Sequence, residues 1–115
     1  MKKILFVCSA NKDRSPTAEN IYKNKKGLKV KSAGTLNCAQ TPLTADLLQW
    51  ADIVLCMSKH HQKHIEDTFP EIIASKTIDS LNIADVYSYM EPLLIKVITE
   101  KVDAWLRENQ VKTEL

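Results

Sequence analysis

The chain has 115 residues, of which 44% are hydrophobic and 26% charged, with only 2 Gly and 4 Pro. This length and composition indicate one folded domain and exclude a disordered or collagen-like chain. The 16 Lys and Arg nearly balance the 14 Asp and Glu, so nucleic acid is not an expected partner. Because no apolar run approaches the roughly 20 residues that span a bilayer, no membrane partner is expected either.

The cysteine and histidine residues do not form a disulfide or metal pattern. The three cysteines are Cys8, Cys38 and Cys56. Their odd number and unpaired spacing indicate free thiols, as in a reducing cytoplasm. The three histidines are His60, His61 and His64. They have no Cys or carboxylate partner at zinc-site spacing, so we expect them on an exposed helix and predict no metal site.

The first half of the chain predicts two strands and one helix. Residues 3–7 form a continuous apolar, β-favouring run, which is typical of a strand buried on both faces. A helix is expected over residues 16–22, with Ser15 as its N-cap and a Pro at its first position. A short strand over residues 28–32 and a loop over residues 35–44 follow.

The second half continues the alternation of strands and helices. Thr44 is expected to cap a short helix over residues 45–50, and an apolar run over residues 53–57 predicts a buried third strand. A helix over residues 58–64 and a weak strand over residues 76–79 come next. The last predicted element is an amphipathic helix over residues 92–107, with an apolar face formed by Leu93, Val97, Val102, Trp105 and Leu106.

This alternation predicts the α/β class. We expect residues 1–115 to form a single domain with three layers, α/β/α, around a four-stranded parallel sheet in the flavodoxin-like order 2-1-3-4. Ligands of such folds bind at the carboxyl ends of the strands, near the point where the strand order reverses. The loop that follows the first strand is therefore the expected functional site.

This loop, residues 8–15, has the residue types of an anion site with a nucleophile beneath it. Backbone N–H groups and the N-terminus of the next helix attract an oxyanion, and the guanidinium of Arg14 can bind two phosphate oxygens. These groups favour the thiolate form of Cys8, which is a nucleophile for phosphoryl transfer. Ser15 is placed to donate to that sulfur, and Asn11 to hold a left-handed turn.

The loop and its surroundings resemble the low-molecular-weight protein tyrosine phosphatases. The resemblance is carried by residues 7–19, V-C-S-A-N-K-D-R-S-P-T-A-E, and by the shorter stretches S-A-G-T at 32–35 and A-D-I-V-L-C-M at 51–57. The chain is shorter than typical members of this family. The resemblance implies a phosphomonoester hydrolase that forms a phosphocysteine on Cys8 and uses no cofactor. Its substrate would be a phosphorylated protein or a small phosphomonoester, with inorganic phosphate or vanadate as a ligand.

The resemblance also implies roles for other loop residues. Arg14 would stabilise the transferred phosphoryl group, and Ser32 would support the loop in a hydrogen-bond network with Asn11 and Ser15. The residues expected to bind phosphate are Ser9, Ala10, Asn11, Lys12, Asp13, Arg14 and Ser15.

The family mechanism needs a general acid from a late loop, usually an Asp followed by Pro and Tyr. Asp85 is the candidate, although Val86 stands where the Pro is expected. Such an Asp protonates the leaving oxygen and then activates water. Asp79 and Glu91 are the alternatives, and Glu91, which precedes Pro92, is more simply explained as a helix start.

Two features depart from the family pattern. Asp13 stands where many members carry a second Cys, and we expect its carboxylate to point to solvent or to pair with Lys12. The loop over residues 36–42 has no aromatic residue to hold a substrate ring. This leaves Tyr87, with Tyr89 as a second candidate, as a substrate wall, so phosphotyrosine specificity does not follow from the motif.

Three other functions stay open at this point. An arsenate reductase shares the loop but passes electrons through further cysteines, and Cys38 and Cys56 are far apart in the sequence. A sugar-transport phosphocarrier also uses a Cys after its first strand, but it has less need of a clamp such as Arg14. A module that binds phosphate or phosphoproteins without turnover is suggested by Val86 and Asp13.

Overall fold

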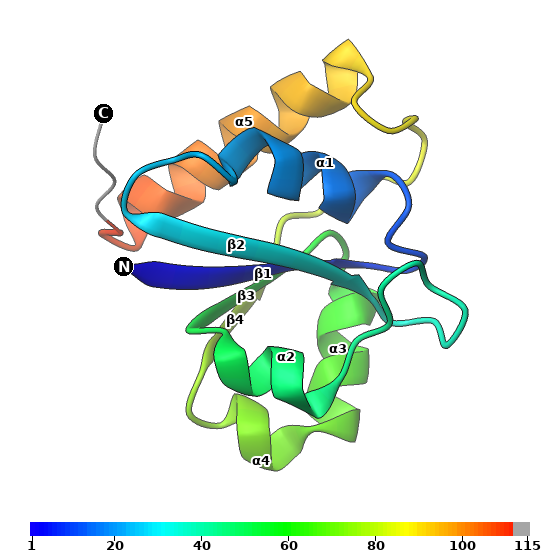
Figure 1. Ribbon diagram of the computed structural model, residues 1–115, viewed down its shortest axis with the longest axis vertical. Helices are drawn as coiled ribbons and strands as arrows, with labels where there is room; N and C mark the ends of the chain where they lie inside the picture. Colours follow the sequence, from blue (N-terminus) through cyan, green and yellow to red (C-terminus); the bar gives the residue numbers. More distant parts are fainter. Residues whose placement is uncertain (112–115) are drawn as a thin grey trace.

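A sheet of four parallel strands lies between two layers of helices in the computed structural model, which describes residues 1–111 (Figure 1). The strands are β1 (Lys2–Cys8), β2 (Leu28–Gly34), β3 (Ile53–Cys56) and β4 (Thr77–Ser80), in the order β2-β1-β3-β4. The α/β class and strand order predicted from the sequence are confirmed. The last four residues of the expected domain, 112–115, lie outside the described residues.

Each face of the sheet is covered by its own group of helices (Figure 1). One group is α1 (Arg14–Tyr22) and α5 (Pro92–Glu108), and the other is α2 (Ala45–Trp50), α3 (Lys59–Thr68) and α4 (Pro70–Ile73). Within residues 1–111, no helix combines the length and hydrophobicity needed to cross a membrane.

Strand β1 separates two hydrophobic cores and contributes to both. Ile4, Phe6 and Cys8 belong to the core beneath α1 and α5, whereas Leu5 and Val7 belong to the core beneath the other helices. Alternate side chains of a strand point to opposite faces, and burial on both faces explains the uninterrupted apolar run of β1. This alternation places the side chain of Cys8 on the face that α1 and α5 cover.

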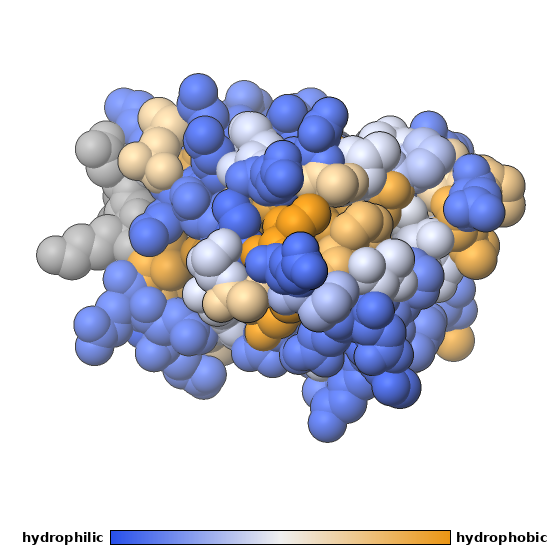
Figure 2. Space-filling model, turned by 90° about the horizontal axis from the view of Figure 1, so that it is seen from below, coloured by the Kyte–Doolittle hydropathy of each residue, from blue (hydrophilic) through white to orange (hydrophobic). Residues whose placement is uncertain are grey.

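Some apolar residues around the second core reach the surface. Seen from the side of α2, α3 and α4, the surface is largely hydrophilic, with apolar residues near its centre (Figure 2). Partly buried side chains that pack against this core are Leu43, Leu47, Trp50, Phe69, Ile72 and Ile78.

Helix α1 begins earlier than the sequence predicted. Its first residue is Arg14, with Asp13 at the N-cap position, so the predicted N-cap role of Ser15 is wrong. Pro16 is tolerated at the third helical position because the first four N–H groups of a helix have no acceptor within it. The hydroxyl of Ser15 is therefore available for the functional loop.

Two further predictions of helical structure need correction. The apolar face of α5 includes the buried residues Leu94 and Ile98, whereas Leu93 is 59% exposed, because the apolar stripe starts one residue later than expected. Helix α4, which begins at Pro70, was not predicted. The predicted cap of α2 is confirmed, since the Thr44 hydroxyl accepts a hydrogen bond from the Leu47 N–H at 3.2 Å.

The start of α3 is linked to the loop after β1 through a buried histidine. The backbone N–H of Ser58 donates to Nδ1 of His61 at 3.1 Å, and Nε2 of His61 lies 2.8 Å from the Ser9 hydroxyl oxygen. A neutral imidazole has one donor and one acceptor nitrogen. Because Nδ1 accepts, Nε2 carries the proton and donates to Ser9.

The surroundings of His61 favour this neutral form. The side chain is fully buried. Its burial, together with the charges of His60, Arg14 and His64, lowers the pKa of His61 from 6.5 to about 3.

We therefore expect the free energy of unfolding to decrease as the pH falls from 7 to 5. In this range the unfolded chain binds a proton at His61 and the folded chain does not, so acid favours unfolding by about 2 kcal/mol. Urea denaturation at the two pH values measures this change. The variant His61→Gln can accept from Ser58 and donate to Ser9 without titrating, so it should lose less stability in acid. An equal loss in both proteins would contradict this role of His61.

Candidate active site

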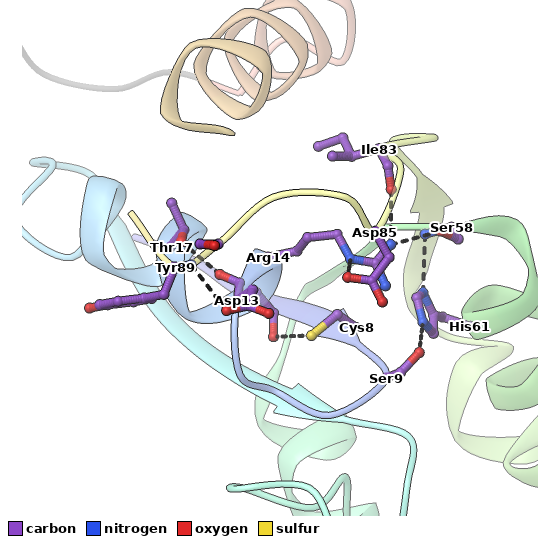
Figure 3. Close-up of polar contacts among 12 residues, drawn as sticks. Cys8, Ser9, Asp13, Arg14, Thr17, Ser58, His61, Ile83, Asp85 and Tyr89 are labelled. Atoms are coloured by element: carbon purple, nitrogen blue, oxygen red, sulfur yellow. Dashed lines mark hydrogen bonds and ion pairs between the residues drawn. The ribbon is translucent and has the colours of Figure 1, made fainter. Parts of the chain in front are cut away.

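The candidate nucleophile lies where β1 ends at the edge of the sheet. Cys8 is the last residue of β1 and is 3% exposed. Its Sγ, drawn in yellow in Figure 3, lies 2.9 Å from Oγ of Ser15, a residue in the first turn of α1. The loop between β1 and α1 therefore brings the sulfur and a hydroxyl together at the start of a helix, where the helix dipole favours negative charge.

Asn11 holds this loop in its tight conformation. Its φ of 53° is in the left-handed region, which Asn tolerates better than most residues. Its side-chain amide donates to Oγ of Ser15 at 2.9 Å and to Oγ of Ser32 at 3.0 Å. Ser32 in turn donates to the carboxylate of Glu19. Because Ser15 accepts from Asn11, its own proton can be donated, either to the Cys8 sulfur at 2.9 Å or to the Ala33 carbonyl at 3.4 Å.

The following loop, residues 35–42, supports the functional loop from outside. The N–H groups of Thr35 and Leu36 donate to the carbonyls of Cys8 and Ser9 at 2.9 and 3.1 Å. Because these carbonyls of the functional loop accept hydrogen bonds from the loop after β2, the N–H groups of the functional loop can bind an anion on its opposite side. Gly34 permits this close packing, since a Cβ there would lie 2.4 Å from the Ser9 carbonyl oxygen.

Arg14 is held in place by groups that follow β3 and β4. It is 3% exposed. Its Nη1 donates to Oγ of Ser58 at 3.0 Å and to the carbonyl of Ile83 at 2.9 Å (Figure 3). The protein therefore uses one guanidinium nitrogen for positioning. The remaining N–H groups can bind phosphate oxygens.

Asp85 lies beside this arginine, with Oδ1 3.6 Å from Nε of Arg14, and its side chain is 66% exposed. It lines a hollow of about 70 Å³. The other residues that line the hollow are Cys8, Ser9, Ala10, Lys12, Asp13 and Arg14. The structure thus brings together the expected nucleophile, the expected arginine and the expected general acid.

The two alternative acids lie elsewhere. Oδ2 of Asp79 accepts from the indole N–H of Trp105 at 2.9 Å. Oε1 of Glu91 accepts from the Ser88 N–H at 3.1 Å, at the start of α5. Neither carboxylate lines the hollow around Cys8.

One expectation about a residue near the hollow needs revision. The carboxylate of Asp13 neither points freely to solvent nor pairs with Lys12, because Oδ1 accepts from the backbone N–H of Tyr89 at 3.0 Å. The loop between β4 and α5 passes over the start of α1 and brings the Tyr89 N–H within hydrogen-bond distance of Asp13. Tyr87 is partly buried against the first core and lies outside the lining of the hollow, and its role as a substrate wall stays a prediction.

The other two cysteines differ in their surroundings. Cys38 is exposed in the loop over residues 35–42. Cys56 belongs to the second core, on the opposite face of the sheet from Cys8. Burial, together with the nearby carboxylates of Glu66 and Asp79, raises the pKa of the Cys56 thiol well above its ordinary value. This placement speaks against an electron relay from Cys8 through Cys56.

Sequence reasoning missed the contributions of Ser58, His61 and the Ile83 carbonyl to the site. His61 was considered only as an exposed helix residue, although it is fully buried. Its position three residues after Ser58 corresponds to that of Glu or Gln in a capping box, which is the one signal in the sequence. In the described part of the chain, no group of three or more His, Cys, Asp or Glu residues is arranged to hold a metal ion.

The similarity of this chain to known proteins includes the loop between β1 and α1. The family model for low molecular weight phosphotyrosine protein phosphatase matches residues 3–42, which include all but the first residue of β1, the functional loop, α1, β2 and most of the loop after β2. The low molecular weight protein-tyrosine-phosphatase Ptp of Acinetobacter johnsonii is 37% identical, over 60% of this chain and 66% of the relative. A protein-arginine-phosphatase of Bacillus subtilis is 33% identical, over 57% and 62%. The chain thus spans slightly less than two thirds of the length of these relatives.

Solved structures share the fold over nearly the whole chain. The YwlE arginine phosphatase from Geobacillus stearothermophilus has a TM-score of 0.70 at 23% identity, with 96% of both chains covered. The low molecular weight protein tyrosine phosphatase SP-PTP from Streptococcus pyogenes has a TM-score of 0.71 at 17% identity, with 94% and 93% covered. The sequence of this chain is thus similar to the low molecular weight phosphotyrosine protein phosphatases over residues 3–42, and its fold is shared with solved structures of such phosphatases.

Proposed function

We propose that the protein removes phosphoryl groups from its substrates through a phosphocysteine formed on Cys8. The observation that carries this proposal is the meeting of Cys8, Arg14 and Asp85 around one small hollow. A nucleophile, a cation for the transferred group and a carboxyl group for proton transfer are the parts that this chemistry needs.

In the first step, the Cys8 thiolate attacks the phosphorus atom. An S–P bond forms while the bond from phosphorus to the leaving atom breaks. Arg14 and the loop N–H groups stabilise the charge on the equatorial oxygens. Asp85, in its protonated form, gives its proton to the leaving atom.

In the second step, water attacks the phosphorus atom of the phosphocysteine, and the Asp85 carboxylate accepts a proton from that water. The S–P bond breaks and inorganic phosphate is released. Negative charge returns to the sulfur, where the Ser15 hydroxyl, 2.9 Å away, can donate a hydrogen bond to it. In this proposed cycle Asp85 transfers the protons, and Arg14, the loop N–H groups and Ser15 stabilise the negative charges. The proposal includes no cofactor.

We propose that the substrate is a phosphorylated protein side chain or a small phosphate ester. The names of the relatives suggest phosphotyrosine and phosphoarginine. The hollow of about 70 Å³ suits the phosphoryl group itself, and none of its lining residues is aromatic. The rest of the substrate would therefore lie outside it, so assays with both phosphoamino acids in one peptide sequence are needed to choose between them.

We also propose that residues 1–115 act as one phosphatase domain in a reducing cytoplasm. The mechanism requires a free thiol at Cys8, and Cys8, Cys38 and Cys56 are all unpaired.

The variant Cys8→Ser should lose turnover of 4-nitrophenyl phosphate across pH 4 to 8 in the presence of EDTA. A serine hydroxyl is a far weaker nucleophile than a thiolate, whereas the loop that binds the anion is unchanged. Release of 4-nitrophenol measures turnover, and calorimetry with inorganic phosphate measures binding. Turnover that survives in Cys8→Ser would contradict the proposed mechanism. Phosphate binding without turnover in the natural protein would instead support the binding module.

The variant Asp85→Asn should lower kcat by about 10²–10⁴-fold, because the amide cannot transfer the proton. Steady-state kinetics with phenyl phosphate, a substrate with a poor leaving group, measures this effect. Glu91→Gln is the matched control, since its amide oxygen can still accept from Ser88 and it lies outside the hollow. A near-normal rate for Asp85→Asn would remove Asp85 from the mechanism, and a loss in Glu91→Gln would point to the alternative acid.

A further inference from the structure

We infer that Asp13 is a positioning residue that holds the loop carrying Asp85 over the hollow. The inference rests on the proposed function, because it concerns the delivery of the general acid. It assigns a role to a carboxylate that borders a phosphate site, where a negative charge is otherwise unfavourable.

Asp13 and Thr17 together hold two consecutive backbone groups of the late loop. Oδ1 of Asp13 accepts from the Tyr89 N–H at 3.0 Å (Figure 3). Oγ1 of Thr17 accepts from the Met90 N–H at 2.9 Å and donates to the backbone carbonyl of Asp13 at 2.6 Å. The start of α1 thus forms a two-point anchor, and the carboxylate of Asp13 supplies one of the two acceptors.

The other end of the loop is anchored independently. The Ile83 N–H donates to the Met57 carbonyl at 2.8 Å, and the Ile83 carbonyl accepts from Arg14. The ammonium group of Lys101 donates to the carbonyls of Leu81 and Asn82, both at 2.9 Å. Asp85 therefore lies in a short span between two fixed points.

Within that span, Tyr87 packs partly against the first core, and Asp85 itself has few contacts. Residues 84–88 belong to no helix or strand, and the neighbouring Val86 is 75% exposed. The contact between Asp85 and Arg14 is 3.6 Å long, which exceeds a normal hydrogen bond. Met90, just beyond the span, has a φ of 60°, a conformation that non-glycine residues adopt only when the surroundings impose it. The place of Asp85 thus depends on the anchors at the two ends and on the packing of Tyr87 between them.

The variant Asp13→Ala removes the acceptor and should release the downstream end of the loop. We expect kcat for phenyl phosphate to fall by about tenfold or more, and kcat for 4-nitrophenyl phosphate to fall much less, because a good leaving group needs less help from an acid. KM should not rise, since the removed charge repels phosphate. A merely structural defect would lower both rates together and would overturn the inference.

The variant Asp13→Asn is the matched control. Its amide oxygen can still accept from the Tyr89 N–H, so its preference between the two substrates should resemble that of the natural protein. Thr17→Val, which removes the other acceptor with little change of shape, should shift the preference in the same direction as Asp13→Ala. If Asp13→Asn and Asp13→Ala lose the same activity, the charge of Asp13 matters rather than its hydrogen bond, and the inference is wrong.

Two measurements separate this inference from the proposed function. In an Asp85→Asn background, Asp13→Ala should cause no further loss with phenyl phosphate, because Asp13 acts through Asp85. Amide hydrogen exchange at Tyr89 and Met90 should be faster in Asp13→Ala than in Asp13→Asn, whether or not the protein hydrolyses anything. If exchange is faster but the natural protein hydrolyses no substrate, the anchoring role of Asp13 is supported and the proposed phosphatase activity is wrong. If exchange is unchanged, the anchoring role of Asp13 is wrong.

Discussion

The turn from β1 into α1 is the constraint on which the site depends. Asn11, in a left-handed conformation, bonds to Ser15 in α1 and to Ser32 in β2. These bonds bring the Ser15 hydroxyl to the sulfur of Cys8, which the buried strand β1 holds at the edge of the sheet. A thiolate needs nearby hydrogen-bond donors to persist at a buried position, and this turn provides them through the fold itself.

The segments that follow β3 and β4 also support that turn. The segment after β3 holds Arg14 through Ser58 and holds Ser9 through His61. The segment after β4 holds Arg14 through a backbone carbonyl and carries the candidate acid. The carboxyl ends of parallel strands meet at one edge of a sheet, so these supports converge there. The strand order 2-1-3-4, with β1 between β2 and β3, explains why the loop after β1 receives them.

The sequence was sufficient for the fold class, the strand order and the central loop, because apolar runs and the spacing from Cys8 to Arg14 are local patterns. It was insufficient where contacts join distant segments. The bonds from His61 to Ser9 and from the Tyr89 N–H to Asp13 span 52 and 76 residues, and they depend on how complete elements pack. Such packing leaves little signal in the local sequence, so the buried His61 could not be distinguished from an exposed helix residue.

The most direct test of the central claim is to locate the phosphoryl group during turnover. The natural protein is mixed with 4-nitrophenyl phosphate and quenched rapidly, and its peptides are analysed by mass spectrometry. The mechanism predicts a phosphoryl group on the sulfur of Cys8, present during turnover and lost when substrate is exhausted. Turnover without this modification, or with the phosphoryl group on another residue, would contradict a mechanism based on Cys8.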